Sequence, residues 1–368
     1  MKIPNKIIVA IALIYIALLV GCESTPALPP SQEITTIDTS YVPITPSFTG
    51  FTVEVIGPDT LGPEDILIGN DQLLYVADTR ANRVVMMNRA GQTLGSREML
   101  RPQSLAQNTR LDLYVGGEMQ APNGDIVGAI FKIRLYSPNS DSAHRIDLAP
   151  IDTIWRELAR PARRFPAITV FGDNQYLAVR TGPDNSSFID PDARVLLFNA
   201  ADAFVTPVPA FVTGVGNGIA YINKPTGIAS FAGTKDFVLT QSIDGVSYGA
   251  IWMRYEQTID FEGWLPRYDP ARVEDRNIDF VRPRRYLQPE AVAIDRTRRD
   301  IFVADAELDS VFKFNSRGRF RNESFGFHQS QGAMRRPTGL AYFERILYVL
   351  DGVTGQVMRF RLSTDIPR

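Results

Sequence analysis

The chain has 368 residues, 44% hydrophobic and 22% charged, and its 39 Lys and Arg against 41 Asp and Glu give a net charge of −2. This near balance argues against a nucleic-acid-binding protein, and the single cysteine excludes a framework of disulfide bonds. The length is sufficient for one large hydrophobic core. We therefore expect one globular domain and no nucleic-acid partner.

The amino terminus has the features of a targeting segment. Lys2 and Lys6 precede an uninterrupted apolar run, Ile7 to Val20, which is shorter than the roughly 20 residues that span a bilayer comfortably. The run leads into Leu19-Val20-Gly21-Cys22. This arrangement resembles the signal peptide of a bacterial lipoprotein, in which residues 1–21 would be removed and the thiol of Cys22 acylated. An ordinary signal peptide or a membrane anchor with a chance cysteine is the alternative.

Acylation of Cys22 implies a location and a partner. The lipid membrane would hold the protein in the bacterial cell envelope, facing the periplasm or the exterior. Residues 22–47 are rich in Pro, Ser and Thr and have no sustained apolar period, which predicts a flexible tether. The globular domain is then expected over residues 48–368.

The stretch from Leu287 to Gly318 shows how that domain is built. It contains three short apolar runs, Ala291–Ile294, Ile301–Ala304 and Val311–Phe314, each bounded by turn-forming residues. Runs of this length, rich in Val, Ile and Phe, are typical of short antiparallel strands rather than helices.

The same unit recurs six times along the chain. Each unit opens on a proline: Pro63, Pro102, Pro166, Pro225, Pro289 and Pro337. Six such units predict an all-β fold, a six-bladed β-propeller with four-stranded antiparallel blades. The chain ends after the third strand of the sixth unit, so we expect the N-terminal run Phe51 to Ile56 to supply the fourth strand and close the ring. One short helix is predicted at Thr153 to Arg160.

Units one, five and six carry a family resemblance. The runs Leu74-Tyr75-Val76-Ala77-Asp78, Ile301-Phe302-Val303-Ala304-Asp305 and Leu347-Tyr348-Val349-Leu350-Asp351 resemble NHL repeats. In the other three units Gly117, Arg180 and Thr240 stand near the expected aspartate. The resemblance implies a propeller of the NHL/TolB-like type with a binding or scaffold role, although some relatives are lyases or lactonases.

Carboxylates are the candidate ligands for a metal ion. Glu64 and Glu290 each follow an opening proline and should lie near the channel mouth, where calcium could bind oxygen ligands. The resemblance to lactonase-type propellers implies a Glu, Asn and Asp set in the channel, but the other units have Gln103, Ala167, Thr226 and Thr338 at this position. That is a poor set for a metal, so we expect no metal site. Asp78, Asp305 and Asp351 are expected to accept backbone N–H bonds.

Histidine chemistry is not favoured either. The two histidines, His144 and His328, fall in different units and lack a metal-ligand spacing.

Basic residues gather just before the opening prolines. The candidates for ligand binding are Arg101, Arg164, Lys224, Arg285 and Arg336. The longest predicted loops connect second to third strands or one blade to the next, and both connection types should emerge on the face where the prolines lie. A rim of arginines there could bind an anionic glycan, a lipid head group or an acidic protein loop. The alternative is that these residues pair internally with nearby carboxylates.

Three functional hypotheses remain open. The first is a membrane-anchored exported lipoprotein whose propeller acts as a ligand- or protein-binding scaffold at one loop-rich face. The second is a propeller hydrolase or lyase of the lactonase-like type, using the channel carboxylates with a divalent cation. The third is a structural subunit of an envelope complex.

Overall fold

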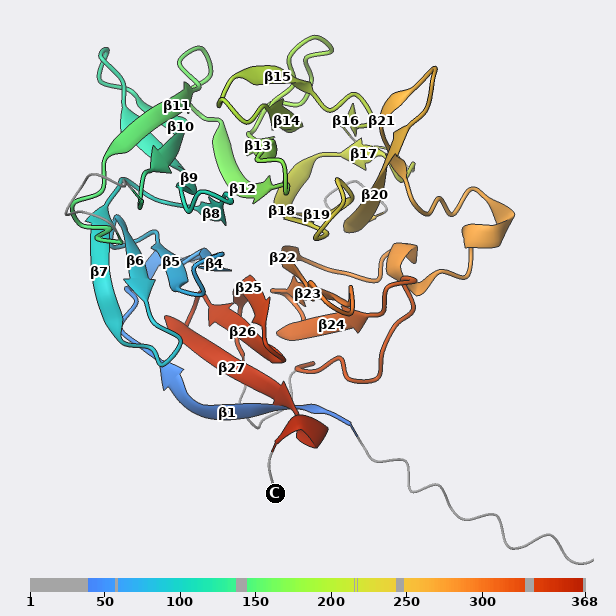
Figure 1. Cartoon of the computed structure of the whole chain (residues 1–368). Coiled ribbons are helices and arrows are strands. Elements are labelled where there is room, and N and C mark those ends of the chain that lie inside the picture. Colours follow the sequence, from blue (N-terminus) through green and yellow to red (C-terminus); the bar gives the residue numbers. More distant parts are fainter. Residues whose placement is uncertain are drawn as a thin grey trace, which may run out of the picture. The chain divides into compact units, whose positions relative to one another are not determined.

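The computed structural model describes residues 39–56, 59–136, 144–214, 216, 218–242, 248–327 and 334–366. The predicted signal peptide, Cys22 and most of the predicted tether lie outside these residues. Within the part of the chain that is described, no helix is long and apolar enough to span a membrane. The fold is an all-β, six-bladed propeller with its blades arranged in a ring (Figure 1), as the sequence predicts.

The first three blades follow one another directly, and each is numbered from the inner strand outward. Blade 1 contains β4 (Asp65–Ile68), β5 (Leu74–Asp78), β6 (Arg83–Met87) and β7 (Thr93–Glu98). Blade 2 contains β8 (Ser104–Gln107), β9 (Leu113–Gln120), β10 (Ile126–Ile133) and β11 (Ile151–Arg156). Blade 3 contains β12 (Arg164–Val170), β13 (Tyr176–Thr181), β14 (Arg194–Phe198) and β15 (Phe204–Pro207).

The last three blades differ in how their outer strand is made. Blade 4 contains β18 (Lys224–Ser230), β19 (Phe237–Ser242), β20 (Ala250–Gln257) and β21 (Glu262–Pro266). Blade 5 contains β22 (Pro289–Ile294), β23 (Ile301–Asp305) and β24 (Ser310–Phe314), and bridges from Phe320 and Phe325 to β24 take the place of a regular outer strand. Blade 6 contains β25 (Pro337–Phe343), β26 (Ile346–Asp351), β27 (Gln356–Leu362) and β1 (Tyr41–Phe48).

An N-terminal strand closes the ring, but it is not the predicted one. The strand that pairs with β27 is β1, with Tyr41 opposite Leu362 and Phe48 opposite Val357. The run expected to do this, Phe51 to Ile56, instead ends in β2 (Glu54–Ile56), which pairs with β3 (Asp59–Leu61). Part of the segment predicted as tether is therefore an outer strand of blade 6. The two prolines of β1 gave this segment the composition of a tether. Prolines interrupt a sheet interior but are tolerated in an edge strand such as β1.

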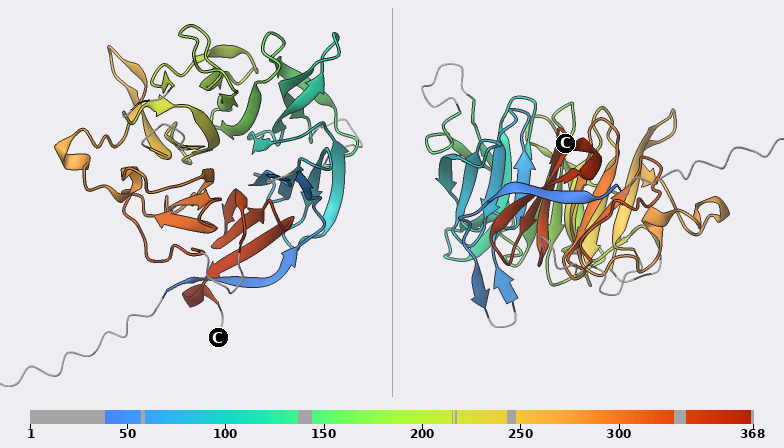
Figure 2. Two further views of the ribbon diagram at one scale, coloured as in Figure 1. Left: turned by 180° about the vertical axis from the view of Figure 1, so that it is seen from behind. Right: turned by 90° about the horizontal axis from the view of Figure 1, so that it is seen from below.

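The remaining elements lie outside the blades. The β2–β3 hairpin leads into β4 and stands out from one face of the ring, as the edge-on view in Figure 2 shows. We call this the proline face, because the inner strands begin there. A short parallel pair joins β16 (Val212–Thr213) to β17 (Tyr221–Ile222). Three 3-10 helices complete the assignment: η1 (Val273–Asp275), η2 (Asp279–Val281) and η3 (Ser363–Asp365).

Two local predictions in blade 2 are wrong. The first half of the predicted helix at Thr153 to Arg160 belongs to β11, which pairs with β10, and the second half is a turn. The sequence also predicts a long loop from Glu118 to Gly128, between the second and third strands, but this segment is mostly strand because β9 and β10 remain paired as far as Gln120 and Ile126.

The second strand of each blade is buried on both sides because blades stack face to face. All five residues of β5 and of β23 are buried, including the aspartates that end them. Asp305 accepts N–H bonds from Leu287 and Gln288, before the opening proline, and from the turn that follows the strand. Asp351 does the same with Arg335, Val353 and Thr354. The structural role expected for these two aspartates is confirmed.

Closure by β1 leads to a prediction about stability. Tyr41 and Phe48 are 6% and 4% exposed and belong to the cores that blade 6 shares with blades 5 and 1. We expect Tyr41→Ala to destabilise the domain by about 3–5 kcal/mol, as for other large aromatic deletions in a core. A chain that starts at Gly50 should melt still lower and aggregate, because the outer edge of β27 is then exposed.

Thermal denaturation of the mature chain, the Tyr41→Ala variant and the truncated chain measures these losses. A chain that starts at Thr39 is the control and should melt like the parent. Equal melting temperatures for the Gly50 and Thr39 chains would rule out strand donation by β1.

Candidate functional site

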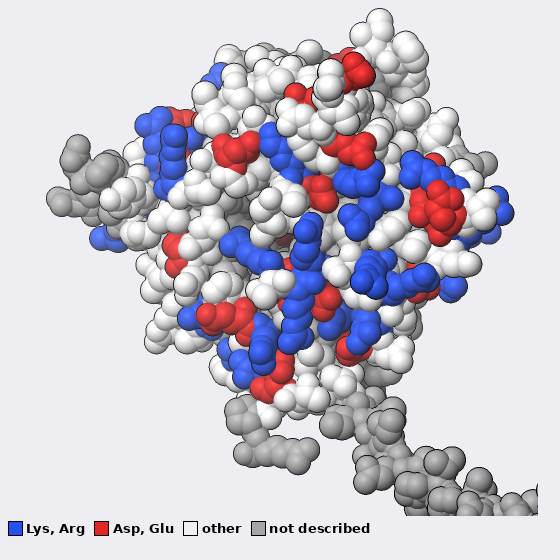
Figure 3. All heavy atoms as spheres, turned by 45° about the vertical axis from the view of Figure 1, so that its right-hand side comes forward, with Lys and Arg blue, Asp and Glu red and all other residues white. Residues whose placement is uncertain are grey.

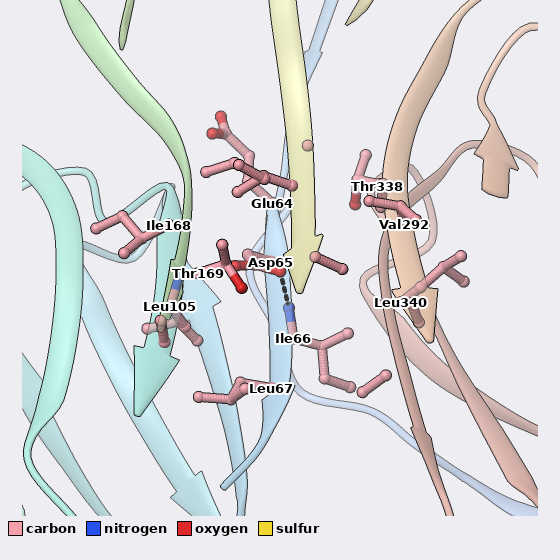
Figure 4. A pocket seen from close by; sticks show the side chains of 18 of the residues that line it. Glu64, Asp65, Ile66, Leu67, Leu105, Ile168, Thr169, Val292, Thr338 and Leu340 are labelled. Atoms are coloured by element: carbon pink, nitrogen blue, oxygen red, sulfur yellow. Dashed lines mark hydrogen bonds between the residues drawn. The ribbon is translucent and has the colours of Figure 1, made fainter. Parts of the chain in front are cut away.

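A cavity of about 390 Å³ lies where the six inner strands meet. Residues from all six, β4, β8, β12, β18, β22 and β25, line it. Its walls combine apolar side chains such as Leu105 and Ile168 with acidic side chains near the start of the inner strands. Figure 4 shows two of these acids, Glu64 just before β4 and Asp65 at its start. A concave site with few polar groups on an apolar wall is where small ligands usually bind.

The cavity brings together the two glutamates selected from the sequence. Glu64 precedes β4 and Glu290 lies in β22, and both line the cavity. Burial and then the charge of Glu290 raise the pKa of Glu64 to about 8, although the guanidinium groups of Arg101 and Arg336 oppose the shift. Burial also raises the pKa of Glu290, whose Oε1 accepts a bond of 2.6 Å from Gln288 Nε2. At neutral pH the pair therefore retains at least part of its protons.

Sequence reasoning missed a third acid, Asp65. Its Oδ2 accepts the N–H of Leu105 from blade 2 at 2.7 Å, and its Oδ1 accepts the N–H of Ile66 at 2.7 Å. Burial raises the pKa of Asp65 to about 7 in spite of these bonds. The sequence signal that could have found it is a charged residue next to Glu64 in an inner strand. Asp65 both links two blades and lines the cavity.

Gln103 occupies the position of Glu64 in blade 2 and also lines the cavity. Its Oε1 is buried and has no hydrogen-bond partner among the described residues. A buried acceptor without a donor costs free energy, so this atom is suited to a donor supplied by a ligand.

The threonines at the corresponding positions of blades 4 and 6 serve the fold. Thr226 Oγ1 donates to the Pro289 carbonyl at 2.7 Å, and Thr338 Oγ1 donates to the Pro63 carbonyl at 2.9 Å. Each hydroxyl therefore joins its blade to the next one in the ring.

The predicted basic rim is only partly assembled. Arg336 lines the cavity together with the two glutamates. Arg101 is close enough to influence Glu64, but its Nε lies 3.9 Å from Glu118 Oε1 at an exposed position. Arg164 donates from Nε to the same Glu118 oxygen at 2.6 Å.

The other two basic candidates do not join this cluster. Lys224 is exposed at the start of β18. Arg285 lies against the outer part of blade 5, with its guanidinium 5.1 Å from the ring centre of Phe320 and 5.8 Å from that of Phe314. Of the predicted site residues, the structure therefore groups Glu64, Glu290 and Arg336, with Arg101 beside them.

A separate ionic cluster occupies the proline-face end of blade 3. Arg163 and Arg180 are 2% and 4% exposed and share the carboxylates of Glu157 and Asp190. Arg163 also donates to Asp192 Oδ1 at 2.7 Å. Because every charge in the cluster is paired, its role is structural, and it fixes the loop between β13 and β14.

Metal ligands do not converge in the residues that the structure describes. No group of three His, Cys, Asp or Glu side chains among them could hold a metal ion.

Comparisons with known proteins identify the fold. No family model matches the chain. No curated protein matches it either. Among solved structures, a PQQ-bound aldose sugar dehydrogenase from Streptomyces coelicolor has a TM-score of 0.56 at 12% identity, covering 91% of this chain and 100% of that one. A proposed gluconolactonase has a TM-score of 0.54 at 12% identity, covering 91% and 94%.

A third similar structure has a different role. An auxiliary nutrient binding protein from Bacteroides thetaiotaomicron has a TM-score of 0.56 at 9% identity, covering 85% of this chain and 72% of that one. Identities this low show a shared propeller fold, which both enzymes and binding proteins use.

The raised pKa of Glu64 predicts how stability depends on pH. Between pH 4.5, its ordinary pKa, and about pH 8, the unfolded chain loses this proton while the folded chain keeps it. The unfolded state then binds fewer protons, so the free energy of unfolding should fall as pH rises through this window. Glu64→Gln should remove the contribution of Glu64 to this slope, which is at most about 1.4 kcal/mol per pH unit.

Melting temperatures of the parent and of Glu64→Gln between pH 4 and pH 9 check this. Glu98→Gln changes an exposed glutamate on β7 and should leave the slope as in the parent. Parallel curves for the parent and Glu64→Gln would mean that Glu64 ionises normally in the folded state.

Proposed function

We propose that this protein is an exported, lipid-anchored binding protein whose propeller holds a small polar ligand in the cavity at the proline face. The observation that carries the proposal is the convergence of Glu64, Glu290, Arg336 and the unpartnered oxygen of Gln103 on one cavity of about 390 Å³. That volume lies near the lower end of the range for small-molecule sites.

The polar groups favour a ligand rich in hydroxyls. With its pKa raised to about 8, Glu64 is mostly protonated at neutral pH and can donate as well as accept. Gln103 Oε1 accepts, and the Arg336 guanidinium donates. A sugar or sugar acid presents alternating donors and acceptors of this kind, and two of the propellers of similar fold are described as acting on such molecules.

The anchor is proposed on the leader alone. An apolar run that ends in Leu19-Val20-Gly21-Cys22 favours acylation of Cys22, and residues 23–38 would connect the lipid to the domain. More than one acyl chain gives stable attachment to a bilayer. The protein would then present its binding cavity in the periplasm or at the cell exterior.

The alternative is a lactonase-like hydrolase. The observation in its favour is a largely protonated carboxyl, Glu64, beside a second carboxyl, Glu290, an arrangement suited to general acid–base catalysis. A divalent cation does not fit the site, because burial favours the protonated carboxyls. Asp65 also lines the cavity, but no group of three acids among the described residues could hold a metal ion. We assign no step to calcium.

Calorimetry with glucose, gluconate and glucono-lactone tests the cavity. We expect binding of at least one of these molecules by the mature chain, weakened at least about tenfold by Gln103→Ala and by Arg336→Met, because each removes a hydrogen-bonding group from the cavity. Glu98→Gln, on the outer strand β7 of blade 1, should bind like the parent.

The same samples separate the two functions. Ring opening of glucono-lactone above the uncatalysed rate, abolished by Glu64→Gln or Glu290→Gln, would establish the hydrolase and overturn the binding proposal. Failure of all three probes to bind would reject the sugar class as ligand.

A labelling experiment tests the anchor. Cells grown with a radioactive fatty acid should label the parent chain, and Cys22→Ser should lose the label and leave the membrane fraction. Lys6→Gln, which retains the cysteine, is the control. Equal labelling of the parent and Cys22→Ser would refute acylation at this residue.

A further inference from the structure

The outer wall of blade 5 is strongly basic. It is made by residues 267–285, which connect β21 to β22, and by residues 315–321 after β24. Three bonds tie the two segments together: Phe280 N to Gly318 O at 3.0 Å, Arg319 Nη1 to Asn277 O at 2.7 Å and Phe320 N to Asp279 Oδ2 at 3.1 Å. They therefore form one continuous surface.

Arginine dominates that surface. Its exposed basic residues are Arg272, Arg276, Arg282, Arg284, Arg317, Arg319 and Arg321, which we call the blade 5 arginine surface. Glu274 is the single exposed acid in these two segments. Figure 3 brings this side of the ring forward and shows Lys and Arg side chains gathered over it. Because the whole chain has a net charge of −2, the charge is unevenly distributed.

The choice of arginine indicates the chemistry of the partner. The two segments contain seven exposed arginines and no lysine. The planar guanidinium forms paired hydrogen bonds with phosphate and carboxylate groups, whereas lysine acts as a point charge. A surface of this kind suits an array of phosphate groups.

The position of the N-terminal strand favours a bilayer as the source of those phosphates. Tyr41, the first residue of β1, packs on blade 5, with its ring centre 5.8 Å from Phe302 and 5.4 Å from Phe325. A chain that comes from an anchored Cys22 therefore joins the domain at blade 5, the blade that carries the arginine surface. A flexible tether of nineteen residues, as the sequence predicts, would span roughly 25 Å on average. The anchor would then keep this wall at high effective concentration near the lipid.

An exposed apolar side chain adds to this argument. Val273 in η1 is 72% exposed between Arg272 and Arg276. An apolar residue flanked by arginines matches the interface of a membrane, where the head groups take the charges and the apolar group enters the acyl boundary. A hydrated acidic polysaccharide would gain nothing from it.

We propose that the blade 5 arginine surface lies against anionic phospholipid head groups of the bilayer that anchors the chain. This orientation leaves the channel axis roughly parallel to the membrane plane, since the surface is on the side wall of the ring (Figure 1). The proline face then remains open to solvent. The proposal takes its bilayer from the lipid anchor proposed above.

The test uses the mature chain, residues 22–368, with Cys22→Ser, so that it measures the surface independently of acylation. Flotation with vesicles of phosphatidylcholine alone, and of phosphatidylcholine mixed with phosphatidylglycerol, gives the partition coefficient. We expect binding to the anionic vesicles that weakens as salt is added. Arg276→Gln, Arg282→Gln and Arg317→Gln together should reduce it roughly 100-fold, since each basic residue near the surface contributes about fivefold.

A matched control carries Arg134→Gln, Arg145→Gln and Arg156→Gln, three exposed arginines of blade 2. It has the same net charge as the blade 5 variant and should bind nearly as well as the parent. Equal loss in both triple variants would show that total charge, not this surface, governs binding.

Two further results would overturn the proposal. One is no affinity for the anionic vesicles at low salt, with circular dichroism confirming the fold. The other is binding to soluble polygalacturonate, lost in the blade 5 variant, together with no binding to vesicles. That result would replace the bilayer with an acidic polysaccharide. Loss of fatty-acid labelling in cells bears only on the anchor and leaves the vesicle result interpretable.

Discussion

Six inner strands meet around the channel, and their backbones approach more closely than ordinary side chains allow. A Cβ at Gly227 would lie 2.8 Å from the Glu290 carbonyl oxygen, and one at Gly339 would lie 3.0 Å from the Ile66 backbone nitrogen. Glycine at these positions removes the obstacle. Where blades come this close, hydroxyls such as that of Thr338 bond to a carbonyl of the next blade. The cavity is what remains between these contacts, so its size depends on them.

The strands could be predicted because each unit repeats the same apolar runs and turns. The closing strand could not, because an edge strand obeys other rules than an inner one. Pro43 and Pro46 interrupt the β1 pattern, yet an outermost strand needs hydrogen bonds on one side alone. Prolines there also discourage pairing with a further chain. The more regular run, Phe51 to Ile56, has the pattern expected of a closing strand, but it leads into the separate β2–β3 hairpin.

The site was predictable to the extent that it follows from position in the repeat. Glu64 and Glu290 come from equivalent places in two blades, so the ring brings them together. The position of Arg285 before an opening proline predicts a side chain at the channel. Because a long side chain can turn away from its strand, it lies instead under the outer wall of blade 5, near Asp279 and Phe320. Gln103 is a poor metal ligand, but its unpartnered oxygen makes it a candidate for contact with an organic ligand.

Blade 3 shows why a weak repeat can still build a regular blade. Asp305 in blade 5 ends the second strand and accepts main-chain N–H groups. Arg180 lies one residue before the end of the equivalent strand in blade 3 and donates to the main-chain carbonyls of Pro191 and Asp192. The polarity is reversed, but in both blades a buried charged side chain satisfies the backbone where the strand ends. A buried arginine requires acids to balance its charge, and Glu157 provides one of them for Arg180. The repeat therefore preserves the requirement to satisfy this backbone while changing the residues that meet it.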